Sequence, residues 1–364
     1  MPPRSAFAGR GRLPVLLCTA LCLAAAAAAV EPACAQSSAI APPPPLTVVK
    51  RPLVAFITSR KHLAADTLDD FVTRAARKAR FQALVEALAD QDWPQVTAIA
   101  DQIGYRAVTV REGRVWYAIV FDRRGRDPIV ILNLKPRREL IIGAPHVGFE
   151  RAIGEQATVL MRDVGARAVI LNGADRCASA AHTACDGTTA VCGASEPYRD
   201  SDVGHNVDTL FHIAHVVLAA RWPNAIVMSI HGMDEDDEGV KTQMIVSNGA
   251  TAKDDDKLTA ATRLRAMIGR AIPPKGTVVS CNLTADEKYQ ARNLCGTTNV
   301  QGRHVNGDAD ACTGGVSQGT GRFIHLEQDR EVRDPYLDDL PNIAAHPFHN
   351  ALVSALGKVA PKVP

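Results

Sequence analysis

The sequence predicts an α/β domain built on a mixed, largely parallel sheet with helices on both faces. Two observations lead to this prediction. Short apolar runs of strand length alternate with segments in which apolar residues recur at helical spacing. Several of the apolar runs end in His, Glu or Arg, as expected where strands of such a sheet present side chains to a ligand. A mature chain of roughly 320 residues is long enough to bury one large core.

The N-terminal segment carries the pattern of an export signal. An apolar run over 13–30 is preceded by three basic residues, Arg4, Arg10 and Arg12. The small-residue triplet Ala33-Cys34-Ala35 follows the run. We therefore predict a signal peptide over 1–35. The alternative is an uncleaved membrane anchor, since the run is long enough to span a bilayer. The alanine content and the small-residue site favour cleavage after Ala35.

Behind the signal, residues 36–50 are rich in Ser and Pro and are expected to form a linker. Residues 51–364 then form a single domain. The mature protein is expected to be periplasmic or secreted, with no stable membrane association after cleavage. A net charge of +2 and 5% aromatic residues provide neither a basic stripe nor a stacking platform, so nucleic acid is not expected as a partner.

Periodicity and breakers predict the following elements. Helices are expected over 66–91, 93–104, 153–164, 208–221 and 257–272, with a last helix from His349. Strands are expected over 106–111, 115–122, 128–135, 139–144, 166–172, 225–230, 244–247, 276–281 and 322–327. His212 and His215 lie inside one of the predicted helices and are interpreted as structural.

Six cysteines follow the signal region: Cys177, Cys185, Cys192, Cys281, Cys295 and Cys312. An even number in an exported chain indicates up to three disulfides. Their clustering suggests one set within 177–192 and another within 281–312, although six cysteines allow fifteen pairings. Zinc ligation by cysteine or a thiol nucleophile is the alternative, but no C-x-x-C occurs and both clusters lie in loop-like stretches.

Candidate metal ligands lie at the ends of three apolar runs. His146 and Glu150 follow LIIGAP, His231 follows AIVMSI, and Glu327 ends FIHLE. Two His and two Glu supply what a mononuclear zinc hydrolase needs, namely three protein ligands and a carboxylate that takes a proton from water. Each residue also has a simpler reading, such as a locally hydrogen-bonded His or a carboxylate in the first turn of a helix.

Three further polar residues lie close to these strand ends in the sequence. Arg176 follows a buried-looking strand and can bind a carboxylate or an oxyanion, or else form a loop salt bridge with Asp175 or Asp202. His205 and Asp208 are candidates for orienting a zinc-bound His. The alternative is that Asn206 or Asp208 caps the following helix.

These motifs, in this order, resemble the zinc-carboxypeptidase-like superfamily, nearest the poly-γ-glutamate hydrolase and N-formylglutamate amidohydrolase type. The resemblance covers about residues 115–333. It implies Zn2+ held by His146, Glu150 and His231, with Glu327 as the base and Arg176 steadying the substrate carboxylate or oxyanion. The four-residue His-to-Glu spacing differs from the HxxE of the peptidases.

The function expected from this resemblance is that of a zinc-dependent hydrolase acting on an amide or peptide bond next to an acidic amino acid. Its substrate would be a small peptide or an N-acyl amino acid. The alternative from another class is a non-catalytic secreted binding module on the same fold, which would need no carboxylate at Glu327.

Overall fold

The computed structural model describes residues 42–364 apart from 235–241, 254–258, 273–277, 284–289 and 292. The predicted signal peptide and the first part of the predicted linker lie outside this range. None of the described helices is long and apolar enough to cross a membrane.

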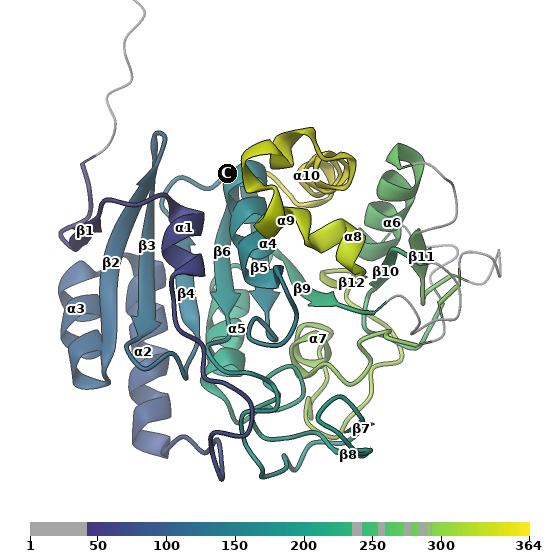
Figure 1. Cartoon of the computed structure of the whole chain (residues 1–364), viewed down its shortest axis with the longest axis horizontal. Helices are drawn as coiled ribbons and strands as arrows, with labels where there is room; N and C mark the ends of the chain where they lie inside the picture. Colours follow the sequence, from purple (N-terminus) through teal and green to yellow (C-terminus); the bar gives the residue numbers. More distant parts are fainter. Residues whose placement is uncertain (1–41, 235–241, 254–258, 273–277, 284–289, 292) are drawn as a thin grey trace, which may run out of the picture. The chain divides into compact units, whose positions relative to one another are not determined.

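The described part of the chain is an α/β structure whose ten-stranded mixed sheet has the order β1-β2-β3-β4-β6-β5-β9-β12-β10-β11. The strands are β1 (Thr47–Val49), β2 (Tyr105–Glu112), β3 (Val115–Asp122), β4 (Ile129–Asn133), β5 (Arg138–Ala144), β6 (Ala166–Leu171), β9 (Ile226–Gly232), β10 (Met244–Ser247), β11 (Val278–Ser280) and β12 (Phe323–Gln328). The central strands β6, β5, β9 and β12 are parallel to one another, whereas β2, β3 and β4 form an antiparallel meander (Figure 1). The predicted fold class is confirmed.

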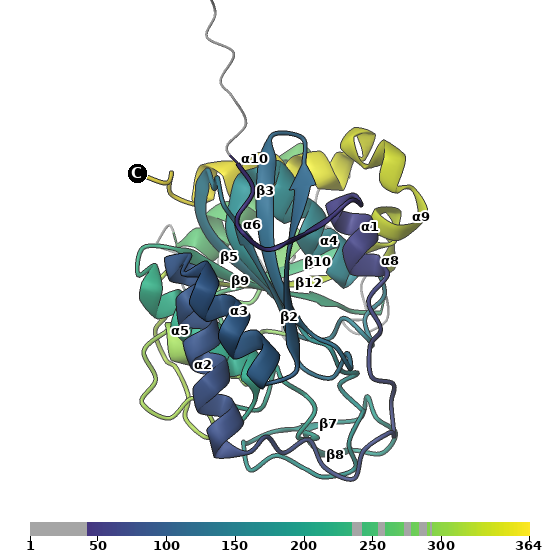
Figure 2. The ribbon, with the colours of Figure 1, turned by 90° about the vertical axis from the view of Figure 1, so that its left-hand side faces the viewer.

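Helices cover both faces of this sheet (Figure 2). One apolar core contains side chains of α1 (Leu53–Thr58), α4 (Ile153–Leu160), α6 (Ala260–Ala271) and α10 (Pro347–Val359). The other contains side chains of α2 (Ala75–Asp90), α3 (Trp93–Gln102), α5 (Leu210–Arg221) and α7 (Val300–Val305). Alternate residues of a strand enter opposite cores: Ile142 packs in the first and Ile141 in the second.

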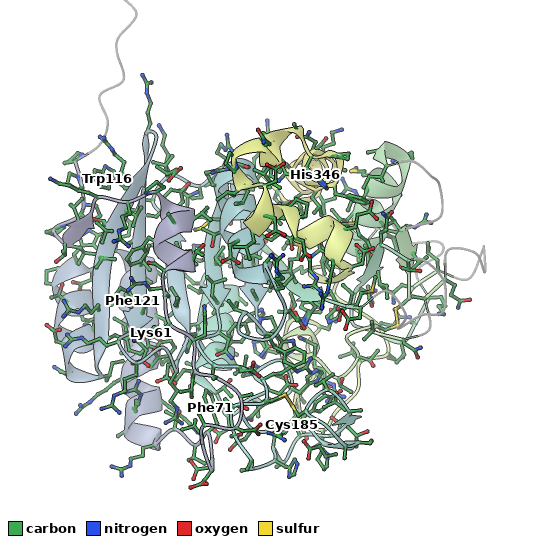
Figure 3. The ribbon with its side chains drawn as sticks, viewed as in Figure 1. Lys61, Phe71, Trp116, Phe121, Cys185 and His346 are labelled. Carbon is green, nitrogen blue, oxygen red and sulfur yellow. A yellow bond between two sulfur atoms is a disulfide. The ribbon has the colours of Figure 1, made fainter. Side chains whose placement is uncertain are left out.

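Aromatic side chains anchor the two layers at one side of the sheet. On the first face, Phe121 packs edge to face on Phe56 of α1 at 5.7 Å between ring centroids. Phe71 lies in the second core, with Phe81 of α2 (Phe71 and Phe121 are labelled in Figure 3). The described residues also form several short elements: η1 (Met161–Gly165), the β7 (Thr188–Thr189) and β8 (Glu196–Pro197) ribbon, α8 (Arg330–Arg333), α9 (Pro335–Asp338) and η3 (Leu340–Ala345).

Besides short helices that were not expected, such as α1 and α7, two segments differ from the sequence prediction. The helix expected from residue 66 begins only at Ala75, because the backbone before it pairs with the loop that follows β6; the amide of Leu68 donates to the carbonyl of Ala178 (2.9 Å). Residues 47–49, expected in the linker, form the edge strand β1 against β2. The spacing of apolar residues reports only local structure. It cannot reveal that this backbone segment pairs in an extended conformation with residues about 110 positions away in the chain.

Candidate metal centre

The candidate site lies at the carboxyl ends of three adjacent parallel strands. His146 follows β5, His231 lies at the end of β9, and Glu327 lies near the end of β12. The register pairs Glu327 directly with His231, so these side chains are neighbours on one face of the sheet. All three side chains are buried.

A single turn after β5 brings Glu150 back to His146. The amide of Glu150 donates to the carbonyl of His146 (2.8 Å), which closes a turn of helical length around Val147, Gly148 and Phe149. A Cβ atom at Gly148 would lie only 3.2 Å from the backbone of Asp175, so a larger residue here would have to displace the neighbouring loop by a few tenths of an ångström.

Three potential ligand atoms converge at this site. The distances are 2.7 Å from His146 Nδ1 to Glu150 Oε1, 3.2 Å from His146 Nδ1 to His231 Nδ1, and 3.7 Å from His231 Nδ1 to Glu150 Oε1. A triangle with these sides has a circumscribed radius of about 1.9 Å. One point about 2.0–2.1 Å from all three atoms therefore exists, which is the length of zinc bonds to nitrogen and carboxylate oxygen.

Each of the three side chains also has a hydrogen-bond partner on its second polar atom. His146 Nε2 lies 2.9 Å from Asp202 Oδ1, and His231 Nε2 lies 2.8 Å from Ser229 Oγ. The amide of Gly232 donates to Glu150 Oε2 (2.9 Å). In metal centres, ligating histidines are oriented by such partners on the second ring nitrogen. The arrangement leaves both Nδ1 atoms and one carboxylate oxygen facing a common point.

The charges of the site also suit a cation. Burial and Arg176 lower the pKa of His146, but Glu150 and Asp202 outweigh them, and the pKa lies above its usual value. Burial raises the pKa of Glu150, yet His146 and His231 hold it well below the ordinary range. Burial lowers the pKa of His231. Two carboxylates therefore favour a positive charge at His146 Nδ1, where a metal ion would replace the proton.

Arg176 belongs to the same network but is tied to protein groups. Its Nε and Nη2 atoms donate to Asp202 Oδ2 (3.0 and 2.5 Å), and Nη1 lies 3.9 Å from Glu150 Oε1. Its guanidinium lies 5.6 Å from the ring centroid of Phe149, which is itself 44% exposed. Of the two salt-bridge partners considered for Arg176, the structure selects Asp202.

Glu327 and His325 extend the site along β12. His325 Nε2 lies 3.7 Å from Glu327 Oε1, and the His325 ring stacks on His231 with centroids 4.5 Å apart. His231, His325 and Glu327 form a second group whose ligand atoms lie within 4.8 Å of one another. Burial holds the pKa of His325 well below its usual value. Both groups share His231, so they form one continuous cluster of buried side chains.

His205 lies beside the site, whereas Asp208 lies away from it on the surface. The ring of His205 is 6.5 Å from that of His146 and stacks on Tyr198, while its Nδ1 lies 3.1 Å from the carbonyl of Thr298. It therefore borders the site without a direct hydrogen bond to a candidate ligand. Asp208 pairs with Lys78 on the surface instead, and Thr209 caps α5 through its hydroxyl.

Sequence reasoning missed three groups that contact the candidate ligands or base: Asp202, Ser229 and His325. Two of them were weakly indicated by the sequence. Ser229 lies two residues before His231, and His325 lies two residues before Glu327, so each shares a face of its strand with the candidate residue. Asp202 lies in a loop 56 residues after His146 and appeared only as a possible salt-bridge partner of Arg176. Nothing in the spacing indicated its contact with His146.

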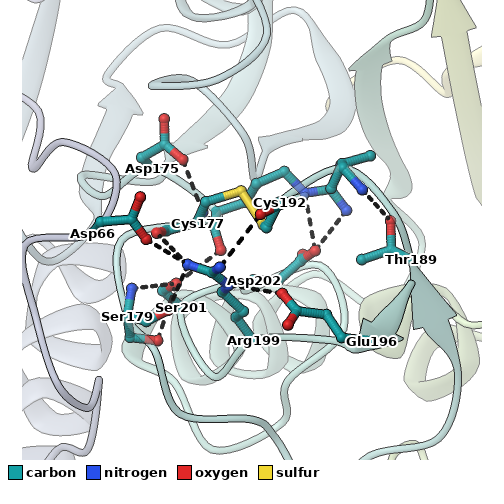
Figure 4. The surroundings of a disulfide bond; sticks show 12 residues. Asp66, Asp175, Cys177, Ser179, Thr189, Cys192, Glu196, Arg199, Ser201 and Asp202 are labelled. Atoms are coloured by element: carbon teal, nitrogen blue, oxygen red, sulfur yellow. Dashed lines mark hydrogen bonds and ion pairs between the residues drawn. A yellow bond between two sulfur atoms is a disulfide. The ribbon is translucent and has the colours of Figure 1, made fainter. Parts of the chain in front are cut away.

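Disulfides hold the loops that carry this network. Cys177–Cys192 closes the loop beside Arg176, and Arg199 ties the same loop together by donating to Asp66 and to the carbonyls of Cys177 and Ser179 (Figure 4). Ser201, next to Asp202, donates to the carbonyl of Arg176 (2.8 Å). The loop is thereby braced on both sides of the Arg176–Asp202 pair.

The three predicted disulfides are present, but one joins the two cysteine clusters. Cys177–Cys192 and Cys281–Cys295 are local, whereas Cys185 pairs with Cys312 across 127 residues. The expectation of two separate sets was therefore wrong for this bridge. Its cause is tertiary, since Arg303 of α7 donates to both Asp186 and the carbonyl of Cys312 and draws the two loops together.

No protein-family model matches this sequence, and comparison with curated proteins finds no match either. Among solved structures, a bacteriophage poly-γ-glutamate hydrolase is similar over 65% of this chain and 88% of its own, with 14% identity and a TM-score of 0.32. A similarity this weak establishes neither a shared fold nor a shared activity.

Proposed function

We propose that this protein is an exported, zinc-dependent hydrolase that cleaves an amide bond. The convergence of His146 Nδ1, Glu150 Oε1 and His231 Nδ1, all on buried side chains, carries the proposal, because such a set is costly to bury without a cation. Two histidines and one glutamate are the ligands of several catalytic zinc sites, which leave one position open.

Zinc held by these residues would supply a Lewis acid that polarises a carbonyl and lowers the pKa of water. Glu327, beside His231 on the neighbouring strand, would take the proton from the attacking water. The water oxygen would bond to the amide carbon, and the C–N bond would break as Glu327 passes the proton to the leaving amine. The products are a carboxylic acid and an amine, so the step balances without another reactant.

Arg176 is proposed to complete the site. Its Nε and Nη2 atoms are occupied by Asp202, so Nη1 is the atom left to meet a developing oxyanion or a substrate carboxylate. This cation supports a preference for substrates with an acidic residue next to the cleaved bond. Export is supported by the signal-like N-terminus and by the three disulfides, which are typical of oxidising compartments.

Hydrolysis of small amides by the purified mature chain tests the proposal. N-acyl glutamates and glutamyl dipeptides are incubated with the protein, and the released amine is quantified beside matched substrates that carry glutamine. We expect release from the acidic substrates, its loss on chelation and its return with added zinc. Release that survives complete chelation would contradict the proposal. A protein inactive on every amide, yet able to bind the acidic ligands, would be the binding module instead.

A further inference from the structure

A basic groove lies at the opposite end of β5 from the candidate metal centre. One pocket of about 560 Å³ is lined by Arg137, Arg138, Lys358 and Lys362, together with Asp163 and parts of α10. A second pocket of about 300 Å³ adjoins it, adds Arg270 of α6 and shares Ser354 and Lys358 with the first. Since β5 runs from Arg138 to Ala144, roughly 20 Å of strand separates this groove from His146.

The cations of the groove are positioned by ordered backbone. The backbones of Lys362 and Arg138 form an isolated antiparallel β-bridge at the start of β5. Beside it, the amide of Glu139 donates to the carbonyl of Pro361 (2.8 Å), and the amide of Val363 donates to the carbonyl of Arg137 (3.2 Å). The Arg137 side chain donates to the carbonyl of Asp163 (2.6 Å). The last residues of the chain therefore fix this edge of the groove.

The charges of the groove are not balanced within the protein. Asp163 is the single carboxylate of the lining, and it is already engaged by Arg162 (2.6 Å) and by His349 Nε2 (3.1 Å). The lining contains five cations, which are Arg137, Arg138, Arg270, Lys358 and Lys362. Within the described part of the chain, none of them forms an ion pair with an acidic side chain. Such a concentration of one sign of charge in a concave surface attracts anions.

We propose that this groove binds a flexible acidic chain that carries carboxylates at intervals. Two adjoining pockets, rather than one, suit an extended ligand with several negative charges. The described lining contains no aromatic residue on which a nucleobase would stack. Its concave shape, without an exposed apolar rim among the lining residues, does not suit the plane of a lipid surface.

The test is fluorescence anisotropy of a short labelled oligoglutamate with the full mature chain in its metal-depleted form. Depletion prevents cleavage and makes the readout independent of the proposed hydrolysis. We expect binding that weakens with added salt and falls at least about tenfold in the double variant Lys358→Glu/Lys362→Glu. The milder Lys358→Ala/Lys362→Ala pair should lose less affinity, and its melting temperature shows that the fold is kept.

A matched control keeps the net-charge change the same but moves it away from the groove. Arg80 and Arg124 are exposed and line neither pocket, so Arg80→Glu/Arg124→Glu should retain most of the binding. Equal losses in both double variants would show a general charge effect and overturn the proposal. Binding to anionic phosphatidylserine vesicles without binding to oligoglutamate would overturn it as well.

Discussion

Buried histidines gather at two places in this molecule, and one histidine of each group, His146 and His215, shows opposite surroundings. At the strand ends, His146 has a carboxylate within hydrogen-bond distance of each ring nitrogen. On α5, neither nitrogen of His215 has a hydrogen-bond partner in the part of the chain that the structure describes. Burial, with His304 adding to it, lowers the pKa of the neighbouring His212 to about 3.

The difference shows that burial alone does not make a metal site. A buried histidine without a carboxylate is held neutral by desolvation and behaves as a packing group. A buried histidine between two carboxylates favours a positive charge in its place, either a proton or a metal ion. If this contrast is correct, substitutions in the two groups should have very different effects.

The largest loss of activity without loss of metal is expected from Glu327→Gln. The amide keeps the shape of the side chain but cannot take a proton, so kcat should fall about 10²- to 10⁴-fold. Metal content and melting temperature should stay close to wild type. The measurement is kcat on the best amide substrate, with zinc quantified in the same sample. Unchanged kcat would show that another group acts as the base.

Asp202→Asn should have an intermediate effect, because it removes the carboxylate behind His146. Loss of such a partner costs about 10- to 100-fold in metal affinity. It also removes one of the two charges that raise the pKa of His146, so that pKa should fall in the metal-free variant. Competition with a chelator gives the affinity, and NMR titration of the imidazole gives the pKa. Wild-type values for both would show that Asp202 serves only to pair with Arg176.

The smallest effect is expected from His215→Leu. Leu has a similar volume and removes two buried nitrogens that have no hydrogen-bond partner among the described residues. Activity should stay within about twofold of wild type, and thermal stability should be unchanged or higher. His146→Leu is the matched substitution in the other group and should abolish zinc binding. Zinc loss in His215→Leu would erase the contrast between the two groups.

Much of the central sheet could be predicted from the sequence, because its strands are short apolar runs bounded by turns. The expected strand over 115–122 coincides with β3, and the one over 244–247 with β10. The start of α2 was missed, since the residues before it pair with a distant loop rather than forming a helical turn. Local periodicity cannot reveal such competition.

The residues of the candidate site also divide into those that the local sequence pattern indicates and those whose position depends on tertiary structure. His146, His231 and Glu327 were visible because polar residues at the ends of apolar strands meet at one edge of a parallel sheet. Asp202 was not singled out as a partner of His146, because its position depends on a loop braced by Cys177–Cys192 and Arg199. The role of Ser229 behind His231 depends on side-chain direction within a strand that looked uniformly buried.

The most direct test of the central claim is the metal content of the purified mature protein, measured by mass spectrometry after dialysis. The account predicts about one zinc per chain in the wild type, Glu327→Gln and His215→Leu, and none in His231→Ala. Two ions per chain would contradict a mononuclear site and would point to the His231, His325 and Glu327 group as a second one. A wild-type protein without metal, or His231→Ala with full zinc, would contradict the proposed centre itself.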